Sequence, residues 1–333
     1  MYQSIIDSKL DLLVKNFNEL KKVKGSWATG MIQHSCALSF TLRGKTIDSR
    51  VVEDMLDIIK KNTNIFSNFR GHNLFYMAVL LSFESNPEAS FLEIQKNYEE
   101  LKKAKFSGSD YLSLSAIIMY ENRDKMDSHT IIERMRYAYD YMKKYHPFLT
   151  SYDDYCNACL LSINSKDLEK DLENIEEFYN YLSKNGFSKN NDLQAMSQIL
   201  AFSQDKSMEK CNKSISLRDT LNQCKCKMGY YGNPVIGAIS LLEYNEKVIV
   251  DDISRATEKL KEVKGFGNWR LGNTYRNMLC ACIVASTYGQ ETVKEHELEK
   301  ISNNIFLNII IAIETATMMA SISAAISASN AAN

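Results

Sequence analysis

Residues 66–81 read FSNFRGHNLFYMAVLL, a link that opens with an aromatic side chain and leads into an apolar run. Similar combinations of link and apolar run recur along the chain, and the aromatic residues that mark them lie 36 to 43 residues apart. The markers are Trp27, Phe66, Phe106, Phe148, Phe187, Tyr230 and Phe266. A fixed period in this range indicates stacked helical hairpins, in which each unit buries its apolar face against its neighbours.

The segments before these links have the pattern of half-buried helices. In the first of them, Leu10, Leu13, Phe17 and Leu20 recur three or four residues apart, which places them on one helix face. The segments after the links, such as residues 280–284, are apolar on nearly all sides. Because a helix of that kind is buried, we expect an inner layer of second helices and an outer layer of first helices.

The sequence therefore predicts an all-α fold in a single domain, residues 1–333. About seven helical hairpins with a period of about 40 residues form an α/α superhelix or a closed toroid, followed by a C-terminal apolar helix. The pattern does not choose between the open and the closed form. The expected hairpins span about 9–45, 50–85, 91–121, 131–164, 168–204, 214–245 and 251–288, and the C-terminal helix spans about 297–329.

The charge balance argues against one class of function. The chain has 40 basic and 41 acidic side chains, whereas a general nucleic-acid binder needs a surplus of Lys and Arg to displace phosphate counterions. The first residues lack the basic stretch and apolar core of a secretory signal. We therefore expect a cytoplasmic protein that does not bind nucleic acid and whose eight cysteines are reduced.

The C-terminal tail has a composition of its own. Residues 305–313 are Ile, Leu, Phe and Ala around one Asn, and Ala and Ser dominate after Met318. About 20 apolar residues suffice to cross a bilayer, but Glu314 and several serines dilute this segment. We expect a helix that packs against the array or caps it, with membrane contact through residues 305–326 as the alternative.

The cysteine spacing is compatible with a zinc site. Cys156 and Cys159 have the CxxC spacing, and two other pairs have the CxC spacing, so four thiolates could be combined around zinc. Counted from the aromatic markers, however, Cys156 and Cys159 take the positions of Leu114 and Ile117 in the preceding hairpin. Cysteine packs as a small hydrophobe, so we expect core packing, no metal and no cofactor.

Several polar residues lie where second helices begin. His34 and His72 fall in adjacent hairpins, and Arg70 precedes His72 by two residues, so a general base or an anion site is one hypothesis. The alternative is that both histidines are hydrogen-bonded within hairpin links. Asp153 and Asp192 suit the helix dipole at such positions, and a glycosidase-like carboxylate pair is the alternative.

Four further residues are predicted to cap second helices. Ser109 and Asn191 precede apolar runs, and Asn233 is followed by a proline that suits the first helical position. Ser151 followed by Asp154 resembles a capping box with Asp in place of Glu.

The last link is about four residues longer than the others and is the most irregular. It contains Trp269, Arg270, Tyr275 and Arg276. Aromatic rings beside arginines suit the binding of an anionic or planar ligand, or of a partner segment. Packing of this link against the C-terminal tail is the alternative.

The chain has no phosphate-binding glycine loop, dinucleotide fingerprint, zinc-protease motif or serine-hydrolase elbow. The leading hypothesis is therefore a non-enzymatic binding or scaffold protein that holds a protein, peptide or small molecule on its inner helical face. Its candidate contacts are Arg70, His72, His34, Trp269, Arg270, Tyr275 and Arg276. One alternative is an α/α-toroid enzyme with a site at one mouth of the inner helices, and its candidates are His34, Arg70, His72, Asp153, Asp192 and Arg276. The other alternative is a membrane-associated protein that uses the tail.

Residues 66–72 (FSNFRGH), 103–112 (KAKFSGSDYL), 267–276 (GNWRLGNTYR) and the Ala/Ser-rich tail 318–333 carry a family resemblance. With these stretches the chain resembles a bacterial family known only as domain of unknown function 4003. The resemblance covers nearly the whole chain. It implies a cytosolic, mostly helical protein, and it supplies neither an activity nor catalytic residues.

Overall fold

The computed structural model describes residues 2–24, 30–201, 208–242, 244–269, 271–295 and 300–331, without the side chains of 291–310, 312 and 328–331. Over these residues the chain forms fifteen α-helices, two short 3-10 turns and no strand. The prediction of an all-α fold is therefore confirmed. Trp27 and Arg270 lie outside the described residues.

The chain divides into two compact units, each built from several stretches of sequence. Unit 1 comprises Met1–Asn16, Leu38–Thr46 and Glu169–Thr317, and unit 2 comprises Phe17–Ala37, Ile47–Leu168 and Met318–Asn333. Three helices are divided between the units: α1 (Tyr2–Leu20), α2 (Gly30–Leu42) and α15 (Lys300–Ala331). The helix that begins at Leu168 has only that first residue in unit 2.

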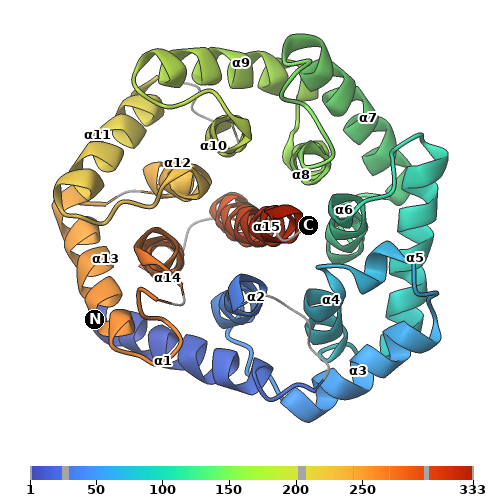
Figure 1. Ribbon diagram of the computed structural model, residues 1–333. Coiled ribbons are helices and arrows are strands. Elements are labelled where there is room, and N and C mark those ends of the chain that lie inside the picture. The colour runs from blue at the N-terminus through green and yellow to red at the C-terminus, as the bar shows by residue number, and fades with distance from the viewer. Residues whose placement is uncertain are drawn as a thin grey trace. The chain divides into compact units, whose positions relative to one another are not determined.

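Unit 2 is formed mainly by three helix pairs, and Figure 1 shows the order of its elements. They are α3 (Ser49–Lys61) with α4 (Leu74–Leu81), α5 (Pro87–Lys103) with α6 (Asp110–Glu121), and α7 (Ser128–Tyr145) with α8 (Asp154–Asn164). The two helices of each pair pack together, and the 3-10 turn η1 (Asn68–Arg70) joins α3 to α4. The first helices α3, α5 and α7 also contact one another in sequence order, as do the second helices α6 and α8. The unit therefore has a layer of first helices and a layer of second helices.

Unit 1 has the same local order of contacts. Its helices are α9 (Leu168–Lys184), α10 (Asn191–Ala201), α11 (Glu209–Gln223), α12 (Asn233–Ser240), α13 (Glu246–Lys261) and α14 (Asn273–Glu295), with the 3-10 turn η2 (Tyr230–Gly232) before α12. The pairs α11 with α12 and α13 with α14 pack together, α11 contacts α13, and α12 contacts both α10 and α14.

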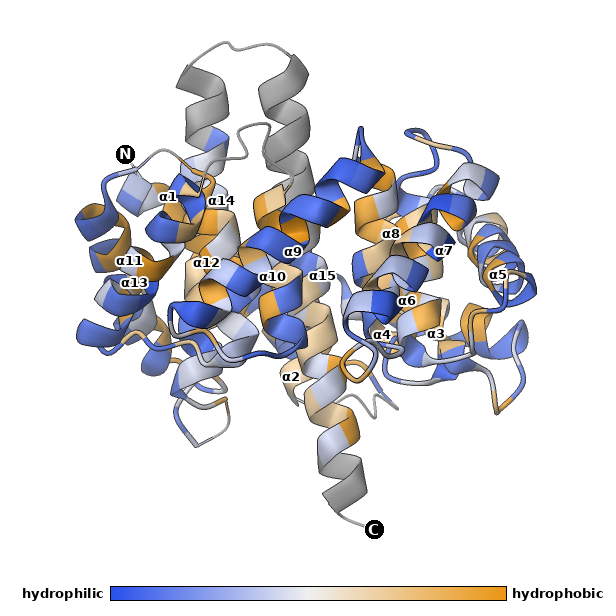
Figure 2. Cartoon of the chain, turned by 90° about the horizontal axis from the view of Figure 1, so that it is seen from above, coloured by the Kyte–Doolittle hydropathy of each residue, from blue (hydrophilic) through white to orange (hydrophobic). Residues whose placement is uncertain are grey.

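Burial follows the apolar pattern of the sequence. The stripe of α9, formed by Leu172, Ile175, Phe178 and Leu182, is buried, while the opposite face of this helix is polar, as its alternating colours in Figure 2 show. By contrast, every residue of α8 except its last is buried. An amphipathic helix covers a core with one face, and an apolar helix lies within the core. Helix α1 begins at Tyr2 and not near residue 9, because the buried Ile6 extends the apolar stripe by one turn.

One of the four predicted caps is confirmed, and a second is confirmed in part. The Ser109 hydroxyl accepts the Leu112 N–H (3.1 Å) and caps α6, which confirms the prediction. The Ser151 N–H donates to Asp154 Oδ2 (2.9 Å), which is one half of the predicted capping box. Helix α8 begins only at Asp154, because the link makes a further turn after Ser151.

The other two predicted caps are wrong by one residue. The Leu193 N–H is accepted by Asn190 (2.9 Å), and Asn191 is already the first residue of α10. Asn233 likewise has helical backbone angles (φ −55°, ψ −46°) and is the first residue of α12. Its side chain is therefore not needed as a cap.

The described part of the tail is a buried helix. Ile313, Met318 and Ile322 of α15 are buried. The buried Glu314 carboxylate accepts hydrogen bonds from the Arg43 guanidinium, with an Nη2–Oε2 distance of 2.5 Å. No helix within the described part of the chain combines the length and the apolar character that a transmembrane segment requires.

The cysteines are free thiols, and seven of the eight are buried. Cys156 and Cys159 lie in the core of unit 2, as predicted, where Cys156 Sγ is 3.4 Å from the Tyr111 carbonyl oxygen. Burial raises the pKa of Cys156 to about 12 and also raises that of Cys159. Both sulfurs therefore remain protonated in this environment, and within the described residues no three His, Cys, Asp or Glu side chains are grouped as metal ligands.

Candidate functional site

His34 has the environment of a core residue. Its ring stacks on Phe17 with centroids 3.9 Å apart, and its Nδ1 lies within hydrogen-bond distance of the Gly30 carbonyl in the preceding turn of α2. Only 2 % of the residue is exposed. A histidine held in this way has little access to a ligand.

Arg70 acts at the end of a helix. Its guanidinium donates to the Thr63 hydroxyl (2.8 Å), the Thr63 carbonyl (2.6 Å) and the Lys60 carbonyl, at the C-terminus of α3. These carbonyls have no partner within the helix, and the helix dipole favours a cation at this end. Arg70 and His72 therefore have separate partners, although they are two residues apart.

His72 is paired with a carboxylate. Its Nδ1 is 2.8 Å from Asp110 Oδ2, and its backbone N–H donates to Asp110 Oδ1 (3.2 Å). The hydrogen bond to Asp110 raises the pKa of the half-buried His72. An aspartate that orients a histidine is one element of acid–base sites, but neither pocket described below is lined by these two residues.

The residues predicted in the last link lie in different environments. Trp269 is 97 % exposed, whereas Tyr275 and Arg276 are buried in the first turn of α14. Arg276 donates to the Phe266 carbonyl (3.0 Å) and to the Asn273 side chain. Arg276 therefore holds the link onto the helix and is not presented to a ligand.

The acidic candidates also differ in their surroundings. Asp153 and Asp192 are half-buried near the starts of α8 and α10. Their neighbour Asp154 is fully buried, and burial, reinforced by the charge of Asp153, raises the pKa of Asp154 to about 7. Asp192 and Arg276 belong to unit 1, and the other candidates of the toroid-enzyme hypothesis belong to unit 2.

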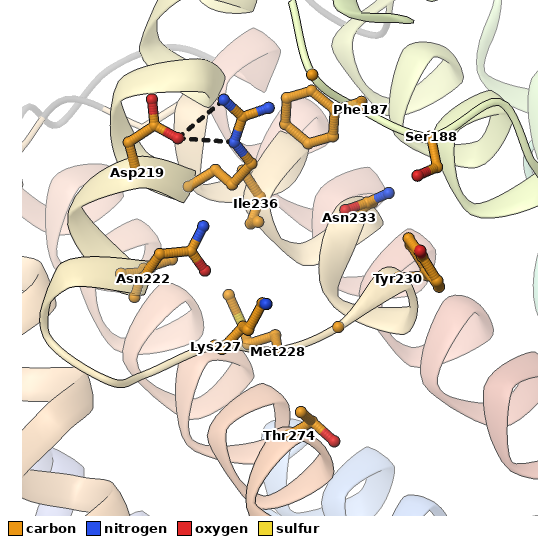
Figure 3. Close-up of a pocket in the computed structure, with 14 residues that line it drawn as sticks. Phe187, Ser188, Asp219, Asn222, Lys227, Met228, Tyr230, Asn233, Ile236 and Thr274 are labelled. Carbon is orange, nitrogen blue, oxygen red and sulfur yellow. Dashed lines mark hydrogen bonds and ion pairs between the residues drawn. The ribbon is translucent and has the colours of Figure 1, made fainter.

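A pocket of about 670 Å³ in unit 1 is the strongest candidate site. It is lined by the α9–α10 link, the last turns of α11, the α11–α12 link, and the first turns of α12 and α14. Figure 3 shows Asn222 on one side of this α11–α12 pocket, Asn233 and Tyr230 on the other, and Lys227 and Met228 between them. Its volume lies within the range of about 300–1,000 Å³ that is typical of small-molecule sites.

The Arg218 side chain in the pocket lining is already bonded to other groups of the protein. The Arg218 guanidinium donates one hydrogen bond to Asp219 (2.8 Å) and one to the Asn185 carbonyl (2.8 Å). Its Nη2 is also ion-paired with Asp219 (2.8 Å), and the guanidinium lies over the Phe187 ring at 4.5 Å. A guanidinium bound on its edges and covered on one face is well ordered. The charge of Asp219 also compensates that of Arg218.

Two glycines shape the α11–α12 link. Gly229 has a φ of +68°, a backbone conformation that other residues adopt only with strain. A Cβ atom at Gly232 would lie 2.2 Å from the Met228 Cβ. The backbone at position 232 can therefore come this close to the Met228 side chain only with glycine. Met228 and Ile236 are buried beneath the link and form apolar parts of the pocket lining.

Six polar side chains of the pocket have no hydrogen-bond or ion-pair partner among the described residues. They are Ser188, Asn222, Lys227, Tyr230, Asn233 and Thr274. Asn233 differs from the others because it is only 5 % exposed. Its amide remains open to the pocket, where it can bond to a ligand or to water. Lys227 carries the only pocket charge that has no described counter-ion.

A second pocket of about 710 Å³ in unit 1 lies between α1 and the end of α2. Its two cations are already bonded: Lys9 donates to the Ser286 hydroxyl and to Gln290 (2.9 Å each), and Arg43 is paired with Glu314. This pocket therefore has fewer polar groups to offer a ligand than the α11–α12 pocket.

The sequence pattern did not indicate the α11–α12 pocket. The pattern treats Phe187 and Tyr230 as repeat markers and Asn233 as a cap, and Phe187 belongs to another link than Tyr230 and Asn233 do. No local motif connects Lys227 to them. Only the contact of α12 with α10, α11 and α14 brings these segments together.

Comparison with known proteins places the chain in a family. The sequence profile described as "Protein of unknown function (DUF4003)" matches residues 16–316. The chain belongs to this family. It is similar to the uncharacterised protein YeaA of Bacillus subtilis (strain 168), with 28% identity over 257 residues that cover 75% of this chain and 76% of YeaA. No solved structure matches the chain. The match to the family includes every residue of the α11–α12 pocket.

Proposed function

We propose that the protein is a non-enzymatic binding protein, and that the α11–α12 pocket binds a small polar molecule with one anionic group. The observation that carries the proposal is Asn233, a largely buried residue whose side-chain amide lines the pocket and has no hydrogen-bond partner within the described residues. The amide atoms are open to the pocket, so a ligand can take the place of water on them.

The charge of the pocket favours an anion. Arg218 is compensated by Asp219, so the net charge of the lining comes from Lys227. A hydrogen bond that involves an ionised group is stronger than one between neutral groups. The ligand class that we propose is therefore a phosphate ester or a carboxylate.

The remaining lining suits hydroxyl groups and a ring. Ser188, Asn222 and Thr274 offer donors and acceptors from three different elements. Tyr230 is 59 % exposed at the edge of the pocket, where its ring can cover one face of a sugar or planar ligand. A phosphorylated sugar or a hydroxy acid combines both features.

Thermal unfolding with a panel of sugar phosphates, nucleotides and hydroxy acids tests the proposal. A ligand that binds only the folded chain raises the unfolding temperature with its concentration. Calorimetric titration of the best compound then compares three variants. We expect Lys227→Ala and Asn233→Ala to weaken binding by about tenfold or more, which corresponds to about 1.5–3 kcal/mol for a hydrogen bond to a charged group.

Lys247→Ala is the matched control, because Lys247 is an exposed lysine of α13 outside the pocket. It should bind the ligand like the unchanged protein. The proposal fails if no compound of the panel stabilises the protein, or if both pocket variants bind as tightly as the control.

We also propose that the chain is one cytoplasmic array of seven hairpins. The support is the chain order, in which a helix with one apolar face alternates with a buried helix from α1 to α14. Small-angle X-ray scattering of the full chain tests the closed toroid against the open superhelix, because an open superhelix has the larger radius of gyration.

A further inference from the structure

Three large apolar side chains of unit 2 lie almost fully in solvent. Phe148 is 100 % exposed, Phe66 is 89 % exposed and Ile65 is 73 % exposed. Ile65 and Phe66 lie in the α3–α4 link, and Phe148 lies in the α7–α8 link. Single exposed apolar residues are common, but several on one side of a protein mark an interaction surface.

The two links lie at the same end of unit 2. His72, just before α4, is bonded to Asp110, the first residue of α6 (2.8 Å). The Ser107 N–H, in the α5–α6 link, donates to the hydroxyl of Tyr155 in the first turn of α8 (3.2 Å). The starts of α4, α6 and α8 therefore adjoin. We call the three links that lead into them the link rim, which comprises residues 62–73, 104–109 and 146–153.

Lysines border the link rim. Each of α3, α5 and α7 has two lysines in its last turn, directly before a rim link, and Lys105 lies within one. The pairs are Lys60 and Lys61, Lys102 and Lys103, and Lys143 and Lys144. Among the described residues, Lys61, Lys103 and Lys105 have no carboxylate partner.

The acidic side chains of the rim offset little of this charge. Asp110 is bonded to His72, and Asp154 is fully buried. Asp153 is half-buried at the start of α8. Lys60 and Lys102 have surface ion pairs within their own helices, at 3.8 and 3.7 Å, and such pairs are weak and easily exchanged. The rim therefore presents a positively charged surface around the exposed side chains of Ile65, Phe66 and Phe148.

From these observations we infer that the link rim of unit 2 docks on a membrane that contains anionic lipids. Ile65, Phe66 and Phe148 enter the interfacial region of the bilayer, and the bordering lysines bind the lipid headgroups. The inference is independent of the α11–α12 pocket, which lies in unit 1.

A membrane fits these features better than a folded partner. Hot spots of protein interfaces lie in closely packed pockets, whereas these exposed apolar side chains are divided between two links. Apolar side chains can insert into a fluid bilayer at several positions at once, and aromatic side chains favour its interface. Each lysine near an anionic membrane surface adds to the electrostatic attraction.

Sedimentation of the full chain with lipid vesicles tests the inference. One set of vesicles contains phosphatidylcholine alone, and the other contains equal parts of phosphatidylcholine and phosphatidylglycerol. We expect binding to the second set only, and weaker binding as salt is added. The double variant Phe66→Ser, Phe148→Ser should lose about tenfold in affinity for each phenylalanine.

Leu92→Ser is the matched control, because Leu92 is 53 % exposed near the start of α5, outside the rim. This variant should bind vesicles like the unchanged protein, and circular dichroism should show all variants equally helical. The inference is overturned if the unchanged protein does not sediment with anionic vesicles, or if the double variant sediments equally well. It is also overturned if ultracentrifugation shows a dimer that the double variant abolishes, because the rim would then cover a second copy.

Discussion

The buried carboxyl of Asp154 should make the stability of the protein fall as the pH rises. Asp154 is 0 % exposed, its Oδ2 accepts the Ser151 N–H (2.9 Å), and its Oδ1 has no hydrogen-bond partner among the described residues. Burial and the charge of Asp153 raise its pKa from 3.8 to about 7, although the Ser151 hydrogen bond and the charges of His146 and Lys143 act in the opposite direction.

The sign and the size follow from proton linkage. Between the two pKa values the unfolded chain has lost the Asp154 proton and the folded protein still holds it. The free energy of unfolding therefore decreases with pH across this window and levels off above about pH 7. A difference of about three pKa units, at about 1.4 kcal/mol for each, gives a total of about 4 kcal/mol.

The perturbation is Asp154→Asn, which keeps the shape of the side chain and removes its titration. Urea unfolding followed by circular dichroism at about pH 4 and about pH 8 gives the stability of the variant relative to the unchanged protein. This difference should move by about 4 kcal/mol in favour of the variant between the two pH values. Any cost of the amide that is constant with pH cancels.

Asp124→Asn is the control, because Asp124 is an exposed aspartate of the same unit with no described contact. Its relative stability at the same two pH values is the baseline with which that of Asp154→Asn is compared. The reasoning is refuted if Asp154→Asn shows the same relative stability at both pH values, because the carboxyl would then titrate as it does in water.

Three further predictions concern single interactions. Arg43→Ala should lower the free energy of unfolding by about 3 kcal/mol, because it leaves the buried Glu314 carboxylate without this cation. Urea unfolding measures the loss. A loss under about 1 kcal/mol would contradict the predicted cost of a broken buried pair. Ser109→Ala should cost about 1 kcal/mol by removing the cap of α6, and an unchanged urea midpoint would count against that cap. The raised pKa of His72 means that its pair with Asp110 stabilises the fold fully below about pH 6.5 and loses this effect as the pH rises through the folded pKa. Unfolding of His72→Gln should therefore lack this fall between about pH 6 and about pH 8, and a parallel pH dependence in both proteins would rule it out.

The sequence alone determined the local structure. Apolar residues three and four apart define a helix face through neighbouring turns of the same helix, so the stripe of α9 and the all-round apolar α8 could be predicted. The cysteines of α8 could be assigned to the core on the same basis. The last link illustrates the limit of this reasoning, since Trp269 and Arg276 are close in sequence but one is exposed and the other is buried.

Only the tertiary structure decided which residues meet and which remain in water. The aromatic markers Phe106 and Phe148 have equivalent places in the sequence pattern, yet the first is 3 % exposed and the second is 100 % exposed. The exposure of each ring depends on the elements that pack over its link, and the local sequence pattern does not contain this information. The α11–α12 pocket likewise needs two links and the starts of α12 and α14 to converge, and its Asn233 is the first residue of α12, where the cap pattern predicts the residue before the helix. Helix periodicity is a property of adjacent turns, whereas a binding site depends on contacts between segments that are distant in the chain.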